Sequence, residues 1–424
     1  MASHASPATH QPPTRLIVPL DGLVRHGLWL AIGLTALARV AAIAVLARPL
    51  ESDGLAYFTL AQSLADTGLM TDQFGHHAFY SPGYPLLLAP FFWAFGAGTP
   101  VAHCVNIALC AVSAALVWRL VLALGGGRGA ALIGGAGFAV WLPSIWQATD
   151  LARENLSTPL MLGFALVCVE IAQGRAGWRR AALAGLVYGL AVLAGTSVVL
   201  TAAAFVVALA ITLVRTPRAG PRRLLAFAGG ALLVLTPWLV ASDAMIGRPV
   251  ITSNGPFNLY IGNNPAADGH FVSMRDTPLA GIWHRRIAVL GEAGTSDWLA
   301  GETRAWIVAN PGRAATLSVK KLALFWAPNV PDRADFAASP LLAGLRAIDL
   351  VQWAAILVLG GIALFGQSFD RRVRWTLAAL IAGFWFIHGA TYVIPRYRDP
   401  IMPVLIALAA LTAARWGSRW SDRA

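Results

Sequence analysis

Long apolar runs recur along the chain from about residue 27 to residue 414, and short polar stretches separate them. A helix that crosses a membrane needs about 20 predominantly apolar residues. The first twenty residues, in contrast, are polar and contain several prolines, which is typical of disorder. The pattern predicts an all-α polytopic membrane protein with about ten transmembrane helices and helices at the outer membrane surface.

Composition and charge support a membrane protein and argue against a nucleic-acid partner. The 424 residues are 57% hydrophobic and 12% charged, with a net charge of +12. A basic balance often indicates nucleic-acid binding, but here the arginines stand in short loops between apolar runs. The three cysteines lie within apolar runs and have no metal-ligand spacing. We therefore expect neither a nucleic-acid partner nor a metal site.

The basic loops predict the topology, because short cytoplasmic loops are rich in Lys and Arg. Basic patches stand at 175–180, 215–223, 369–375 and 415–423, with Arg128 in a further short loop. If these patches are cytoplasmic, each segment between two of them crosses the membrane twice. Residues 181–214 then make an outer turn at 195–197, and both termini are cytoplasmic.

Four regions follow from this topology. We expect a disordered cytoplasmic segment at 1–26, a transmembrane core at 27–241 with its first outer loop at 48–100, a long periplasmic segment at 242–347, and transmembrane helices with a cytoplasmic tail at 348–424. Within the long segment, two short helices are predicted around 279–290 and 296–309. Residues 315–328 fit either an amphipathic interfacial helix, starting at Asn310 and Pro311, or a further span.

Acidic residues on the outer side are the first candidate chemistry. Asp53 precedes a short helix with one apolar face, so it is either the N-cap of that helix or a functional acid at the membrane boundary. Asp150 and Glu154 are four residues apart, which would place them on one helical face. The alternative for this second pair is a solvated turn between two spans.

Arg396 and Arg398 are the second candidate, because the topology puts them outside, against the charge rule. They either extend to phospholipid headgroups or bind a phosphate, whose oxygens suit the planar guanidinium fork. No nucleotide-binding loop occurs in the sequence. An enzyme at the outer face would therefore need a substrate activated on a lipid carrier.

The order of these motifs resembles the GT-C glycosyltransferases that use polyprenyl-phosphate sugars. The resemblance rests on the acid after the first span with "AYFTLAQSLADTG", then "SPGYPLLLAPFF", "WLPSIWQATDLARENL", "SNGPFNLYIGNNPAADG" and "RYRDPIMP". The chain is similar to bacterial relatives of protein O-mannosyltransferases and to lipid A sugar transferases. The resemblance extends over about residues 28 to 415.

The resemblance implies roles for several residues. Asp53 matches the catalytic acid and Glu154 the acid after the third span, with Asp150 competing for that role. Arg396 matches the basic residue near the last span. The family often has Arg or Lys just before the "PGYP"-like turn, where this chain has Tyr80 and Ser81; the candidates to replace it are His76, His77 and Arg48. Arg398, Lys320 and Lys321 are further candidates for the donor phosphate.

The function expected from this resemblance is inverting transfer of a monosaccharide from a polyprenyl phosphate to an acceptor hydroxyl. It implies a bacterial inner-membrane enzyme with its active site facing the periplasm. Its partners would be membrane lipid, a polyprenyl-phosphate sugar and a glycan, lipid or protein acceptor, with no cofactor. The alternatives are a transporter or flippase of lipid-linked sugars and a noncatalytic assembly protein.

Overall fold

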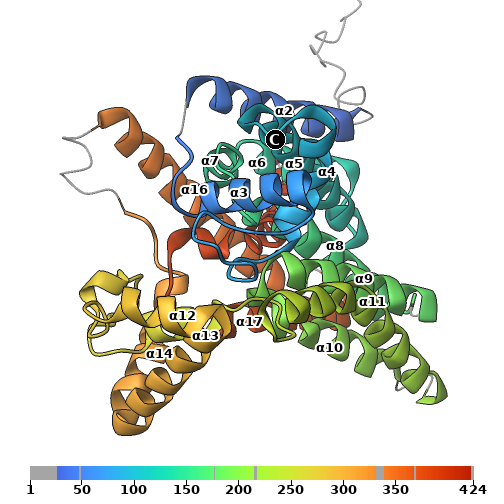
Figure 1. Cartoon of the computed structure of the whole chain (residues 1–424). Coiled ribbons are helices and arrows are strands. Elements are labelled where there is room, and N and C mark those ends of the chain that lie inside the picture. The colour runs from blue at the N-terminus through green and yellow to red at the C-terminus, as the bar shows by residue number, and fades with distance from the viewer. Residues whose placement is uncertain are drawn as a thin grey trace, which may run out of the picture.

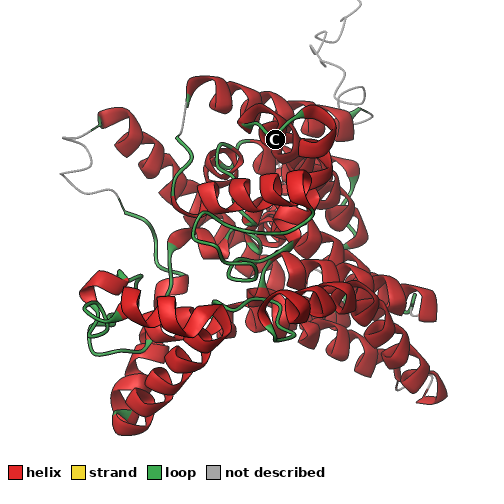
Figure 2. Cartoon of the chain, viewed as in Figure 1, coloured by secondary structure: helices red, strands yellow, loops and turns green. Residues whose placement is uncertain are grey.

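The computed structural model describes residues 26–46, 49–175, 177–213, 217–330, 339–366 and 369–421. These residues form helices joined by loops, and none of them forms a strand (Figure 2). The all-α prediction is confirmed. Most of the segment 1–26 that we expect to be disordered, and Arg48, lie outside the described residues.

The helix bundle contains most of the chain. Its helices are α2 (Gly27–Val45), α5 (Thr99–Ala123), α6 (Arg128–Ala139), α7 (Leu142–Ala148), α8 (Glu154–Ala172), α9 (Trp178–Ala194), α10 (Ala202–Leu213), α11 (Gly220–Ile246), α16 (Pro340–Phe365), α17 (Arg371–Ile387) and α18 (Met402–Ser421). Among the described residues, α2, α5, α8, α11 and α16 are each long and apolar enough to cross a membrane. The pair α6 and α7, bent by 53°, makes a sixth candidate.

The polytopic prediction is confirmed, while the number of about ten spans stays a prediction. Helices α9, α10, α17 and α18 do not meet the length and hydropathy of a full span. They nevertheless pack into the same bundle, α9 against α11, α10 against α17 and α18 against α16 (Figure 1). The turn expected at 195–197 is present, because α9 ends at Ala194 and a 3-10 helix, η1 (Thr196–Thr201), follows.

The remaining helices lie in the segments that the topology puts outside, with one exception in a basic loop. They are α3 (Ser52–Thr67), α4 (Gly83–Phe95), α12 (Gly255–Gly262), η3 (Met274–Asp276), α13 (Trp283–Ala309), α14 (Pro311–Phe325) and η4 (Pro395–Arg398), while η2 (Pro217–Ala219) belongs to a basic loop. In Figure 1, α12, α13 and α14 form a group at the lower left, and α3 runs across the front of the bundle.

The two short helices predicted in the long segment appear as α13 with a break in it. Gly291 interrupts the helical backbone at φ 65°, a left-handed value that glycine adopts without steric cost. The stretch 315–328 falls largely in α14, which has 15 residues and is not among the helices able to span a membrane. Asn310 occupies the N-cap position of α14 and Pro311 begins the helix, as expected, but the Asn310 side chain makes no capping hydrogen bond. It donates instead to the carbonyl of Trp306 at 2.9 Å.

The break between α6 and α7 is closed from two sides by polar side chains. Arg39 of α2 is fully buried and donates to the carbonyls of Phe138, at 3.1 Å, and Ala139, and to Oγ of Ser144 at 2.9 Å. From α16, Gln352 donates to the carbonyl of Val140 at 2.9 Å and accepts from the amide of Leu142 at 3.0 Å.

Within a membrane, backbone groups freed by such a break must find partners inside the protein. Arg39 and Gln352 are those partners. They fix the backbone on both sides of Trp141, which therefore has a defined position at the corner between the two helices.

We expect Arg39→Met to destabilise the fold, because it keeps the apolar stem and removes the donors to the carbonyls of Phe138 and Ala139. Each buried acceptor left without a partner costs about 1–3 kcal/mol. The apparent unfolding temperature of the purified protein in detergent should fall, whereas Arg119→Met, at an exposed position of α5, should leave it unchanged. Equal unfolding temperatures for both variants would contradict this role of Arg39.

Candidate functional site

Asp53 lies in the first turn of α3 and contacts Arg396, which is 343 residues away in the sequence. Nη2 of Arg396 donates to Oδ2 of Asp53, and both side chains are about one third exposed. The expectation that Asp53 caps α3 is wrong, because Glu51 precedes the helix and Asp53 is already inside it. The carboxylate is therefore free of the helix backbone and paired across the fold.

Arg396 is the residue that connects Asp53 with the interior. It stands in η4, and its Nε is buried with no acceptor among the described residues. Burial would lower the pKa of Arg396, but the nearby Glu154 and Asp53 carboxylates and Tyr397 outweigh burial and raise it. The guanidinium is thus a permanent cation with one edge on Asp53 and another without a partner.

Asp150 lies close to Asp53 but not on a helix with Glu154. It occupies the turn between α7 and α8, so the expectation that the two acids share a helical face is wrong. A Cβ atom on Gly54 would lie 2.7 Å from Oδ1 of Asp150, so only glycine allows this approach. The side-chain amides of Asn106 and Asn155 fix the turn by donating to the Asp150 carbonyl, each at 3.0 Å.

Glu154 begins α8 and is 4% exposed. Its Oε1 accepts from Nε of Arg153 at 3.3 Å, and Nη1 of Arg153 reaches Oγ of Ser81 at 3.4 Å. The guanidinium of Arg153 also lies over the Tyr397 ring, 5.9 Å from its centre. Arg153 therefore brings a cation to Ser81, beside the "PGYP" turn where the sequence itself has none.

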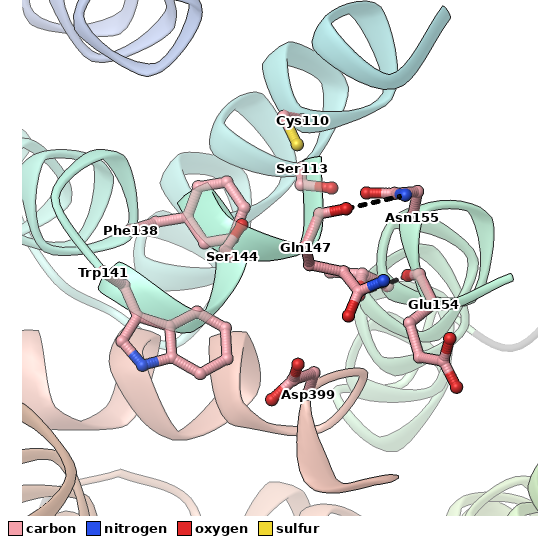
Figure 3. Close-up of a pocket in the computed structure, with 10 residues that line it drawn as sticks. Cys110, Ser113, Phe138, Trp141, Ser144, Gln147, Glu154, Asn155 and Asp399 are labelled. Carbon is pink, nitrogen blue, oxygen red and sulfur yellow. Dashed lines mark hydrogen bonds between the residues drawn. The ribbon is translucent and has the colours of Figure 1, made fainter. Parts of the chain in front are cut away.

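A small internal cavity of about 10 Å³, room for about one water molecule, separates Glu154 from Asp399 (Figure 3). Gln147 and Asn155 also line it, and Asn155 donates to the Gln147 carbonyl at 3.2 Å. Asp399 is buried, and its pKa is raised well above the usual value by burial and by the charge of Glu154. Sequence reasoning missed Asp399, although it directly follows the two outer arginines.

A larger pocket of about 460 Å³ adjoins Asp399 and Arg396. Its walls come from the corner of α6 and α7, from α16 and from η4. Apolar and aromatic side chains make up much of the lining: Leu142, Pro143, Ile145, Trp141, Trp146, Leu342, Leu345, Trp353 and Met402. Its charged residues are Arg346, Arg396, Arg398, Asp150, Asp349 and Asp399. It thus combines an apolar wall with cations suited to a phosphate.

Arg398 lines this pocket, as the phosphate hypothesis requires, but part of its guanidinium is already used. Its Nη1 donates to the carbonyls of Phe325, at 3.3 Å, and Ala327, at 2.5 Å, at the end of α14. Arg346 of α16 is a third arginine of the pocket. Sequence reasoning assigned Arg346 to the long outer segment and gave it no role.

Three predicted phosphate ligands, Lys320, Lys321 and His77, are not brought to this pocket. Lys320 is exposed on α14, and its neighbour Lys321 is buried with Nζ 3.0 Å from Oδ1 of Asn263. Burial lowers the pKa of Lys321 to about 8. His77 lies in the first outer loop, where its backbone amide donates to Glu292 of α13 at 2.7 Å. His77 thus joins the first loop to the long segment.

Metal binding finds no support from clustered ligands. Within the described part of the chain, no group of three or more His, Cys, Asp or Glu side chains could hold a metal ion. The expectation that the protein has no metal site stays a prediction.

Comparisons with known proteins bear on this arrangement. The family model of glycosyltransferase family 87 matches residues 78–253, a stretch that contains Asp150 and Glu154 but neither Asp53 nor Arg396. The match covers less than half of the chain and shows a similarity to this glycosyltransferase family over that stretch. A comparison with curated proteins gave no match.

Two solved structures share the fold. ArnT from Cupriavidus metallidurans, bound to undecaprenyl phosphate, is 14% identical with a TM-score of 0.55, covering 95% of this chain and 63% of ArnT. The Archaeoglobus fulgidus oligosaccharyltransferase, with Zn and sulfate, is 13% identical with a TM-score of 0.50, covering 93% of this chain and 50% of that enzyme. The GT-C fold is thereby confirmed. Because this chain spans 50% and 63% of those two proteins, its activity, substrates and partners are proposals.

Gly54→Ala is expected to disturb the site without unfolding the protein. The added methyl group would meet the Asp150 carboxylate and push it away from the start of α3. Any turnover that depends on Asp53 and Asp150 should fall at least about tenfold, since small displacements of reacting groups have large effects on rate. Gly33→Ala is the control, because a Cβ there would have no neighbour within 4 Å. Equal activity of the two variants would contradict the close approach of α3 to Asp150.

Proposed function

We propose that this protein transfers a monosaccharide from a polyprenyl-phosphate donor to an acceptor hydroxyl, with inversion, on the periplasmic face of a bacterial inner membrane. The observation that carries the proposal is the pairing of Asp53 with Arg396 beside a 460 Å³ pocket that contains two further arginines. The undecaprenyl phosphate in the ArnT structure, which shares the fold, supports a lipid phosphate as the donor's carrier.

The donor phosphate would bind at Arg396. One edge of this guanidinium holds Asp53, and the Nε on another edge has no acceptor in the described residues. Phosphate oxygens accept hydrogen bonds from arginine in a forked geometry. Arg346 and Arg398 add positive charge along the same pocket. The isoprenoid stem would lie along the apolar side chains of α7 and α16.

Asp53 would act as the general base. Its carboxylate takes the proton of the acceptor hydroxyl while the hydroxyl oxygen attacks the anomeric carbon. The bond between that carbon and the phosphate oxygen breaks, and the polyprenyl phosphate leaves with its bonding electrons. A base in this position contributes about 10²–10⁴-fold. Attack from the face opposite the leaving phosphate inverts the anomeric configuration.

Arg396 would stabilise the charge that develops on the leaving phosphate, because a fixed cation in a partly dry site acts strongly on such a charge. Because the same guanidinium also binds Asp53, it would fix the position of the base relative to the leaving phosphate. The phosphate itself is the leaving group, so the step needs no redox cofactor.

The long outer segment would cover the site and select the acceptor. Glu292 of α13 accepts from the amides of His77 and Ala78, at 2.7 and 2.9 Å, and from Oγ of Ser253 at 2.6 Å. These bonds hold the first outer loop, which follows α3, against the long segment. An acceptor would therefore approach Asp53 between two segments that are fixed to each other.

A transporter would need charged side chains in mid-span, and the structure gives Arg39 a different role. Arg39, which the sequence places inside the first span, is bound to the backbone break of α6 and α7. A flippase or transporter of lipid-linked sugars therefore gains no support from it.

Asp53→Asn should abolish sugar transfer while the protein stays folded, because the amide keeps the shape of the side chain and cannot take the proton. We expect the release of polyprenyl phosphate from a labelled donor, by purified protein, to fall at least about 100-fold. Glu51→Gln, at the exposed position before α3, is the matched control and should retain activity. Full activity of Asp53→Asn would end the assignment of Asp53 as the base.

A further inference from the structure

Lys321 is a buried cation that the proposed mechanism does not use. Its side chain, on α14, is fully buried, and Nζ donates to Oδ1 of Asn263 at 3.0 Å and to the carbonyl of Ala390 at 3.4 Å. Both of these acceptors are neutral oxygens. Burying an ammonium group without an opposite charge costs free energy, so close packing alone would favour an apolar side chain at this position.

Asn263 binds the same carbonyl as Lys321. Its Nδ2 donates to the carbonyls of Leu259, in α12, and of Ala390, each at 2.7 Å. Asn263 directly follows α12, and Ala390 stands in the loop after α17. The two buried side chains therefore connect α12 and α14, which belong to one group of helices (Figure 1), with the loop that leads to Arg396.

This loop, residues 389–393, is bound to the long outer segment at further points. The amide of Val393 donates to the carbonyl of Gly269 at 3.0 Å. A Cβ atom on Gly262 would lie 2.5 Å from the carbonyl carbon of Thr391, so the end of α12 approaches the loop backbone closely. The position of the loop is therefore set by the long outer segment as well as by α17.

Arg396 lies between two attachments of its segment to α14. The first is at Ala390, before Arg396 in the sequence, where Lys321 donates. The second is at Arg398, after it, where Nη1 donates to the carbonyls of Phe325 and Ala327, at 3.3 and 2.5 Å. Because the segment is bound to α14 on both sides of Arg396, the position of the Arg396 guanidinium depends on these attachments.

We infer that Lys321 is a positioning residue for Arg396. Together with Asn263 it fixes the loop that enters η4, and so holds the guanidinium where it contacts Asp53 and lines the large pocket. A group that binds phosphate through a fork of hydrogen bonds has to be held within about 0.5 Å of its productive position. The inference rests on the proposed function, in which Arg396 binds the donor phosphate.

The test uses two lipids and the purified full-length protein in detergent. Dissociation constants are measured for undecaprenyl phosphate and for undecaprenol, which has the same stem and no phosphate. Their ratio, the phosphate discrimination, isolates the contribution of the phosphate group. Wild type should bind undecaprenyl phosphate at least about tenfold more tightly than undecaprenol, and Arg396→Gln should remove most of this difference.

Lys321→Met keeps an apolar stem and removes the ammonium group. We expect it to lower the phosphate discrimination about three- to tenfold and to leave the affinity for undecaprenol unchanged. Asn263→Ala should do the same, because it removes an acceptor of Lys321 and a donor to Ala390. Lys320→Met, which removes the same charge at the exposed neighbouring position, is the matched control and should bind both lipids as wild type does.

A double-mutant cycle shows whether Lys321 acts through Arg396. When Lys321→Met is added to Arg396→Gln, the phosphate discrimination should fall by less than about twofold further. If the two substitutions lower it independently, so that their effects multiply, Lys321 does not act through Arg396 and the inference is wrong. A merely structural role would also weaken the binding of undecaprenol, which has no phosphate to contact Arg396.

The outcomes separate the inference from the proposed function. Wild-type discrimination in both Lys321→Met and Asn263→Ala, with discrimination lost in Arg396→Gln, overturns the inference and leaves the proposed function intact. Equal binding of the two lipids by wild type, or full discrimination by Arg396→Gln, overturns the proposed phosphate site and this inference together.

Thermal unfolding shows whether each variant is folded. If one of Lys321→Met and Asn263→Ala does not fold, the other decides the test. Failure of both to fold overturns the inference, because the two side chains would then support the fold as a whole rather than the position of Arg396.

Discussion

The contact between Asp53 and Arg396 is the interaction on which the site depends. It joins the start of α3, near the beginning of the chain, to η4, near its end, and no local preference of either segment would bring them together. Because both side chains are partly exposed, the pair adds little to stability. Its importance lies in position: it places a carboxylate, a cation and the edge of a pocket within one small region.

The second constraint is that backbone groups within a membrane need partners. The chain breaks a span at Trp141, and two distant side chains, Arg39 and Gln352, satisfy the groups that the break frees. In an unbroken helix, Trp141 and Gln147 would follow the regular helical path, which would not place both of them at the pocket. The break sets them at a corner, where both residues line the large pocket.

Much of this architecture could be predicted from the sequence, because spans and their orientation follow from apolar length and arginine placement. Asp53 and Arg396 could each be singled out as charges at a membrane boundary, but their pairing depends on how the helices pack. The spacing of Asp150 and Glu154 was misleading, since i,i+4 spacing has meaning only inside a helix and Asp150 lies in a turn.

Other site residues gave no signal that sequence patterns could detect. Trp141 and Trp353 stand in apolar surroundings, where a tryptophan is most simply a packing residue. Asp399 could have been noticed as an acid beside two arginines, yet its burial and its raised pKa come from Glu154 and the surrounding helices. Arg153 was visible in its motif, but only the fold shows that it reaches Ser81, far along the chain.

The most direct measurement of the central claim is chemical cross-linking of positions 53 and 396. The three native cysteines would be replaced by alanine, Asp53→Cys and Arg396→Cys introduced, and a protease site inserted after Gly127, in the exposed turn between α5 and α6. With a short bifunctional thiol reagent in native membranes, the two fragments should stay joined after cleavage, whereas Asp53→Cys paired with a cysteine at the exposed Arg371, at the start of α17, should separate. Complete separation of the fragments in the 53–396 variant would contradict the account.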